Sequence, residues 1–171
     1  MLKRGAVPGL IAALSLLAGE VQAEDKERES IGELEIGVAG EWSLPGGRSS
    51  FGPSAAIEFT AIQDRLEIEL GVSPLFANGH TAWGTELIFK TPVFSFDNMV
   101  VTFGLGPGWQ HKVGGGGATN TLVGEVQLDF QFWQLPERKL GWFVEPSYGY
   151  SFGAEHEQSL GVTVGLLIAI P

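Results

Sequence analysis

The stretch Glu33–Leu44 alternates between two kinds of side chain with a period of two residues. Its even positions are apolar apart from Gly40, and its odd positions are acidic, small or hydroxylated. This is the side-chain period of a β-strand whose two faces have unlike surroundings. Because similar runs recur through most of the remaining chain, this pattern constrains the fold more than any other feature of the sequence.

Seven further runs alternate in the same way, and short connections rich in Gly, Pro, Asn and Asp separate most of them. The runs are Phe51–Ile62, Leu66–Ser73, Trp83–Thr91, Met99–Gln110, Leu122–Phe132, Trp142–Phe152 and Leu160–Ile170. We expect Thr91–Asn98 to be a connection and the glycines of Gly114–Gly117 to belong to a flexible loop. About eight strands in hairpin order predict an all-β, antiparallel up-and-down barrel.

The chain has the organisation of an exported single-domain protein. Lys3 and Arg4 precede a short apolar run and a small-residue cleavage site, so residues 1–23 are predicted to be a signal peptide. The apolar run is shorter than the roughly 20 residues that a membrane-spanning helix needs. Residues 24–32 form a charged leader that we expect to be disordered. Residues 33–171 are the predicted barrel domain.

Composition excludes several classes of function. The chain has 20 acidic and 10 basic residues, a net charge of −10, and no cysteine. An acidic chain without a basic stripe is a poor ligand for nucleic acid. The lack of cysteine excludes disulfides, thiolate metal sites and thiol catalysis. Neither a zinc-type spacing nor a complete phosphate-binding loop is present, so we expect no cofactor.

Alternation alone does not say which face of the barrel points inward. A secreted or periplasmic lipocalin-like barrel would enclose a hydrophobic ligand with its apolar face, whereas a membrane barrel would turn that face to lipid. The membrane is favoured because the apolar faces carry no charge, the polar faces carry small residues that fit a narrow lumen, and aromatic residues gather at strand ends. The two aromatic groups are Trp42, Phe51, Trp83, Trp109, Tyr150 and Phe152 at one end, and Phe94, Phe96, Phe132, Trp133 and Trp142 at the other.

From Glu33 to its C-terminus the chain resembles small bacterial outer-membrane β-barrel proteins of the opacity-protein and OmpA-barrel type. The resemblance implies a non-enzymatic integral outer-membrane protein with a structural or surface-interaction role and no wide pore. It also implies membrane lipid, lipopolysaccharide and the outer-membrane assembly machinery as partners, and it points to no particular surface partner. Members usually end on an aromatic residue, whereas this chain ends Ala169-Ile170-Pro171.

If the polar face is the lumen, carboxylates are concentrated there, and Lys90 is the cation that clearly lies beside them. Buried carboxylates with few cationic partners share protons or bind cations. A hydrogen-bonded network that braces the barrel is the plainer alternative. The candidates for a proton-sharing or divalent-cation site in the lower lumen are Glu35, Glu67, Glu69, Asp129 and Glu145, with Lys90.

One further alternative is a lipid A-modifying outer-membrane hydrolase or acyltransferase. His156 and Ser159, with Glu155 or Glu157, could supply a nucleophile, a base and an acidic partner near the loop end of the barrel. Their spacing does not match the His-x-Ser pattern of the deacylase family. We therefore predict no catalytic residues.

Overall fold

The computed structural model describes residues 31–44, 46–114, 116–134, 138–153 and 156–170. The predicted signal peptide, residues 24–30 of the predicted leader, and Pro171 lie outside the described residues. The strands are β1 (Gly32–Ser43), β2 (Ser49–Ile62), β3 (Leu66–Ala77), β4 (His80–Ser95), β5 (Met99–Gly114), β6 (Gly117–Trp133), β7 (Leu140–Ser151) and β8 (Gln158–Ile170).

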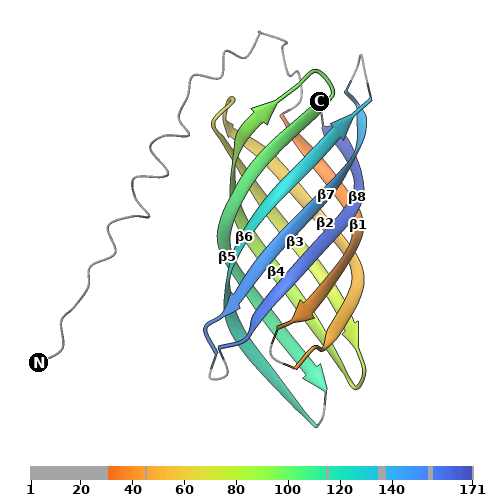
Figure 1. Cartoon of the computed structure of the whole chain (residues 1–171), viewed down its shortest axis with the longest axis vertical. Coiled ribbons are helices and arrows are strands. Elements are labelled where there is room, and N and C mark those ends of the chain that lie inside the picture. The colour runs from red at the N-terminus through yellow and green to blue at the C-terminus, as the bar shows by residue number, and fades with distance from the viewer. Residues whose placement is uncertain (1–30, 45, 115, 135–137, 154–155, 171) are drawn as a thin grey trace, which may run out of the picture.

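Each strand pairs antiparallel with its neighbours in chain order, and β1 pairs with β8 to close the barrel (Figure 1). The predicted eight-stranded up-and-down barrel is confirmed. Because the number of strands is even, β1 begins and β8 ends at the same end of the barrel. We call this the terminal end, and the opposite end the mouth. None of the described segments is a helix of the length and apolarity needed to cross a membrane.

Two connections predicted from the sequence are wrong in extent. The strand pattern does not stop at Thr91, because β4 continues to Ser95 and pairs with β5 across a register shift between Pro92 and Phe94. Such an irregularity accommodates a proline, which has no N–H group for the ladder. The two outer glycines of the run Gly114–Gly117 belong to the sheet, since Gly114 ends β5, Gly117 begins β6 and the two pair with each other, whereas Gly116 lies in the turn between them.

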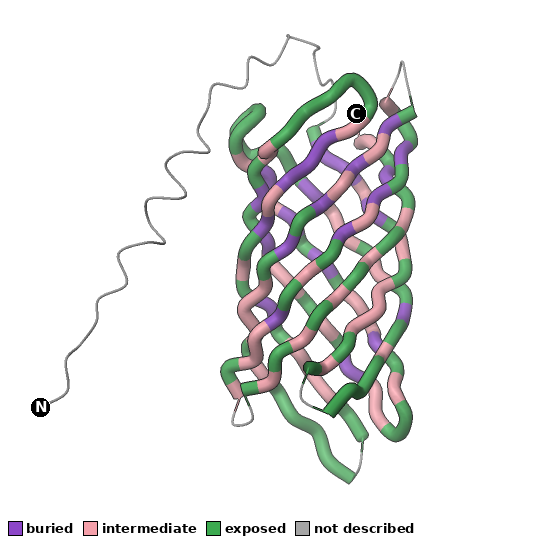
Figure 2. The backbone as a smooth tube through the Cα atoms, in the orientation of Figure 1, coloured by how far each residue is buried: buried purple, intermediate pink, exposed green. Residues whose placement is uncertain are grey.

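Buried and exposed residues alternate along the strands (Figure 2). The large exposed residues of the outer wall are apolar, whereas the buried residues of the lumen include Lys90 and many carboxylates. Leu70 and Leu105 are 51% and 50% exposed on the outer wall, whereas Glu69 and Lys90 are 1% and 0% exposed inside. A lipocalin-like carrier requires the opposite arrangement, with apolar side chains enclosing the ligand. The orientation therefore confirms the predicted transmembrane barrel and overturns the carrier alternative.

An apolar cluster lies in the lumen at the terminal end. Val100, Trp133, Phe143 and Leu167 are buried and pack together, with Ala169 against them. We call these four residues the apolar plug. Trp133 was predicted to belong to the lipid-facing aromatic group with Phe94, Phe96, Phe132 and Trp142. This is wrong, because Trp133 is buried and follows Asp129 and Gln131 on the inward face of β6.

Replacing either of two glycines on the inward face of β5 by alanine should change the free energy of unfolding by different amounts, because the lumen is narrow. A Cβ on Gly106 would overlap the carbonyl oxygen of Leu87, whereas the nearest atom to a Cβ on Gly108 is Thr85 O at 3.4 Å. We expect Gly106→Ala to lower the free energy of unfolding by about 1–3 kcal/mol, which is typical of overpacking. Gly108→Ala should be close to neutral. Urea unfolding of the refolded barrel in vesicles measures both, and equal losses would contradict the prediction.

Candidate functional site

A single buried ammonium group lies at the centre of the charged lumen. Lys90 extends inward from β4, and five carboxylates from β1, β2, β3, β6 and β7 surround it. Its Nζ is 3.1 Å from Glu58 Oε2, 3.3 Å from Asp129 Oδ2 and Glu145 Oε2, and 3.5 Å from Glu35 Oε1, and it also pairs with Glu69. We call these six residues the Lys90 cluster. Its side chains come from six of the eight strands.

Neutral side chains extend the cluster. Gln127 Nε2 donates a hydrogen bond to Glu145 Oε2 at 2.6 Å, and Gln131 Nε2 donates one to Asp129 Oδ2 at 2.9 Å. Thr102 lies opposite Asp129 in the register of β5 and β6. All three neutral side chains are buried, so they form part of the lumen interior and have no access to bulk water.

The Lys90 cluster has far more acceptor than donor capacity. An ammonium group carries one charge and three N–H donors, whereas five ionised carboxylates carry five charges and accept only. Charges buried away from water are costly unless they are paired. Lys90 alone cannot compensate five carboxylates, and the cluster is therefore suited to take up protons or a further cation.

The structure brings most of the predicted lumen residues together. All five predicted carboxylates are buried, and Glu35, Glu69, Asp129 and Glu145 contact Lys90. Glu67 is buried and lies directly opposite Lys90 in the register of β3 and β4.

Glu58 was not among the predicted site residues, although it contacts Lys90. Its place on the polar face of β2 was visible in the alternation. The height of Glu58 in the barrel could not be predicted, because height depends on the register of the neighbouring strands. In the structure Glu58 pairs with Glu33 on β1 and with Glu69 on β3.

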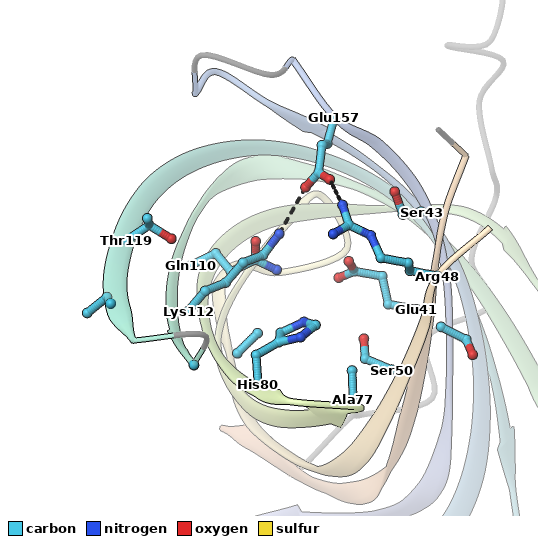
Figure 3. A pocket seen from close by; sticks show the side chains of 15 residues that line it. Glu41, Ser43, Arg48, Ser50, Ala77, His80, Gln110, Lys112, Thr119 and Glu157 are labelled. Carbon is cyan, nitrogen blue, oxygen red and sulfur yellow. Dashed lines mark hydrogen bonds and ion pairs between the residues drawn. The ribbon is translucent and has the colours of Figure 1, made fainter. Parts of the chain in front are cut away.

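A cavity of about 310 Å³ opens at the mouth, and we call it the mouth cavity (Figure 3). Glu157, from the β7–β8 connection, bridges two cations at its rim. Arg48 Nη2 is 2.5 Å from Glu157 Oε1, and Lys112 Nζ donates to Glu157 Oε2 at 2.9 Å. Glu41 and His80 point into the cavity between these groups (Figure 3).

A second, inner cavity of about 90 Å³ lies deeper in the lumen. It shares Glu41 and Gln110 with the mouth cavity, and its lining includes Glu86, Glu125 and Glu145. The inner cavity is also lined by Glu145 of the Lys90 cluster, so it adjoins both the mouth cavity and the cluster. The apolar plug lies at the opposite end of the lumen.

The residues considered for lipid A chemistry do not share hydrogen bonds within the described segments. His156 Nδ1 is 3.2 Å from the hydroxyl of Tyr150, and both carboxylate oxygens of Glu157 are held by Arg48 and Lys112. Ser159 lies on β8, opposite Gly149 in the register with β7. Glu155 lies outside the described residues.

No family model matches the chain, and no curated protein matches its sequence. Several solved structures share its fold. Neisserial surface protein A has a TM-score of 0.68 at 12% identity, covering 82% of this chain and 98% of that one. The N-terminal β-barrel domain of Pseudomonas aeruginosa OprF has a TM-score of 0.55 at 16% identity, covering 80% and 99%. Ail, the attachment invasion locus protein of Yersinia pestis, has a TM-score of 0.51 at 12% identity, covering 80% and 97%.

These three proteins are small outer-membrane barrels of eight strands. At such low sequence identity the similarity shows the fold alone. The shared fold is the one that the predicted resemblance implies, and in this respect the resemblance is confirmed. The chain thus has the fold of small eight-stranded outer-membrane barrels, with its charges inside.

Removing the central ammonium should destabilise the barrel strongly. Lys90→Met leaves five buried carboxylates without their shared cation, and breaking a buried ion pair costs about 3–5 kcal/mol. The matched control is Lys112→Met, which removes a partly exposed rim pair and should cost at most about 1 kcal/mol. Urea unfolding at pH 7 in divalent-free buffer measures both variants. Similar losses in the two would contradict a central role for Lys90.

The rim bridge should depend on pH in a defined direction. The hydrogen bond from Lys112 and the nearby charges of Lys112 and Arg48 outweigh burial and hold the pKa of Glu157 below its ordinary value. A carboxylate with a lowered folded-state pKa stabilises the fold above its unfolded-state pKa, and this contribution is lost as the pH falls through the folded-state value. The stability difference between wild type and Glu157→Gln should therefore vanish only in acid. A difference that grows on acidification would contradict this.

Proposed function

We propose that this chain is a non-enzymatic integral protein of the bacterial outer membrane with a structural or surface-interaction role and no wide pore. The observation that carries the proposal is the inverted polarity of the barrel, with an apolar outer wall around a charged lumen. An apolar surface of this extent is characteristic of a membrane or protein contact rather than of a surface in water. Transmembrane barrels have such an outward apolar band.

Aromatic side chains at both ends of the wall support a bilayer as its surroundings. Trp42, Trp83 and Trp109 are exposed near the mouth, and Phe94 and Trp142 are exposed near the terminal end. Aromatic residues are enriched at the two headgroup regions of a membrane, where one part of the ring is apolar and the other is wet. The apolar wall between these rings then faces the hydrocarbon core.

The proposal places the terminal end, where β1 begins and β8 ends, in the periplasm and the mouth outside. It includes export through the predicted signal peptide at residues 1–23, and insertion by the outer-membrane assembly machinery. It also includes contact of the outer wall with membrane lipid and lipopolysaccharide.

The β5–β6 hairpin is the part best suited to surface interaction. These strands have 16 and 17 residues, whereas about 9–11 residues suffice to cross the hydrocarbon core. Their paired ends extend beyond the other strands at the mouth (Figure 1). His111 and Asn120 form a hydrogen bond of 2.7 Å across this projecting part. This projecting hairpin gives the protein a modest outward surface.

The contents of the lumen support the absence of a wide pore. The apolar plug fills one end, and the Lys90 cluster fills the section above it. An eight-stranded barrel is only wide enough for its own side chains. The proposal therefore assigns the lumen to stability and binding rather than to transport of solutes.

Cell fractionation of a Gram-negative host that expresses the full chain tests the proposal. We expect the protein in the outer-membrane fraction, soluble only in detergent, with different gel migration before and after heating. In planar bilayers it should give no porin-like current. A periplasmic marker protein is the control. Recovery of the chain in the osmotic-shock supernatant, or heat-independent migration of the detergent-soluble protein, would overturn the proposal.

A further inference from the structure

We propose that the Lys90 cluster is a binding site for one divalent cation, Ca²⁺ in preference to Mg²⁺, that is reached from the mouth. This inference goes beyond the proposed outer-membrane role and does not depend on it. It rests on the convergence of carboxylates, on buried neutral oxygens that lack a partner, and on the shape of the lumen.

Two overlapping sets of carboxylates have the geometry of a metal site. Glu35, Glu58 and Asp129 form one set, and Glu35, Glu69 and Glu145 form the other. Within each set one oxygen from every residue lies within 4.8 Å of the others, and all five residues are buried. Two oxygens bound to the same calcium ion at 2.3–2.6 Å can be at most about 5 Å apart. Glu35 belongs to both sets, and Lys90 Nζ lies within 3.5 Å of all five residues. A cation bound by either set would therefore share these carboxylates with the ammonium group.

Two neutral oxygens at the cluster supply an independent indication of a ligand. Thr102 Oγ1 and Gln127 Oε1 have no hydrogen-bond partner among the described residues, and each residue is only 1% exposed. Thr102 lies opposite Asp129, and Gln127 already donates its amide N–H to Glu145. Buried polar atoms without a partner are rare in native proteins. An amide oxygen among carboxylates is a typical ligand of calcium.

The charge balance favours a second cation beside Lys90. Lys90 has three N–H donors for five carboxylates, so some carboxylate oxygens stay without a donor. The cluster offers only oxygen ligands, which suit hard cations such as Ca²⁺ and Mg²⁺ rather than softer metals. Mg²⁺ keeps several waters and needs a strict octahedron, whereas Ca²⁺ accepts six to eight oxygens in flexible geometry. A crowded set of side-chain oxygens therefore favours Ca²⁺.

The cavities mark a route for the ion from the mouth. They share Glu41 and Gln110, and the inner cavity is lined by Glu86, Glu125 and Glu145, the last of which belongs to the cluster. The apolar plug beyond the cluster offers no oxygen side chains among its four residues. An ion that enters at the mouth would bind and leave by the same route. The proposal is therefore binding without conduction.

Calorimetric titration of the refolded barrel in detergent, freed of metal by a chelator, tests the site. CaCl₂ should bind at one saturable site and raise the melting temperature, and MgCl₂ should bind at least tenfold more weakly. Glu35→Gln removes the shared carboxylate and should weaken Ca²⁺ binding at least tenfold. Glu41→Gln, which changes a luminal carboxylate outside both sets, is the matched control and should change the affinity less than threefold.

The variant Lys90→Met should change the Ca²⁺ affinity in the opposite direction. It removes the competing cation, so it should tighten Ca²⁺ binding at least tenfold, and Ca²⁺ should restore part of its lost stability. Where Glu35→Gln fails to refold, Asp129→Asn takes its place with the same expected direction. No saturable heat at pH 7 would mean that protons alone satisfy the cluster, and the proposal would fall. Equal weakening by Glu41→Gln and Glu35→Gln, or weaker binding in Lys90→Met, would also overturn it.

Discussion

The shared ion pairing of Lys90 is the interaction on which the rest of the barrel depends. One ammonium group contacts carboxylates from five other strands, so it ties together most of the wall through its interior. These contacts are strong because the lumen is shielded from water, and the same shielding makes any unpaired charge costly. An apolar outer wall is compatible with this interior because lipid, and not water, is its solvent.

The lumen has three levels with different chemistry, and their order determines what the protein can do. The apolar plug closes the terminal end, the Lys90 cluster occupies the next level, and the two cavities lead from there to the mouth. Glu157 ties Arg48 and Lys112 together at the rim. The cavities lie on the mouth side of the Lys90 cluster, which suits binding from that side.

Much of the candidate site was predictable, and the errors have local causes. The alternation placed Glu35, Glu69 and Asp129 together on the polar faces of their strands without any knowledge of the fold. Trp133 was assigned by its type rather than by its position in the alternation, which puts it inside with Asp129. Pro92 was taken as the end of a strand, whereas a register shift allows β4 to continue past it.

The sequence by itself determined the strands, their number and the separation of apolar from acidic faces, because a period of two residues is a local property of the chain. Only the tertiary structure decided which carboxylates lie at the level of Lys90. The height of a residue in a closed barrel depends on the register of every pair of strands and on the closure of β1 with β8. For this reason the contact of Glu58 with Lys90 was not predicted from the sequence. The apolar plug was not predicted either, because its four residues come from four different strands that meet only in the closed barrel.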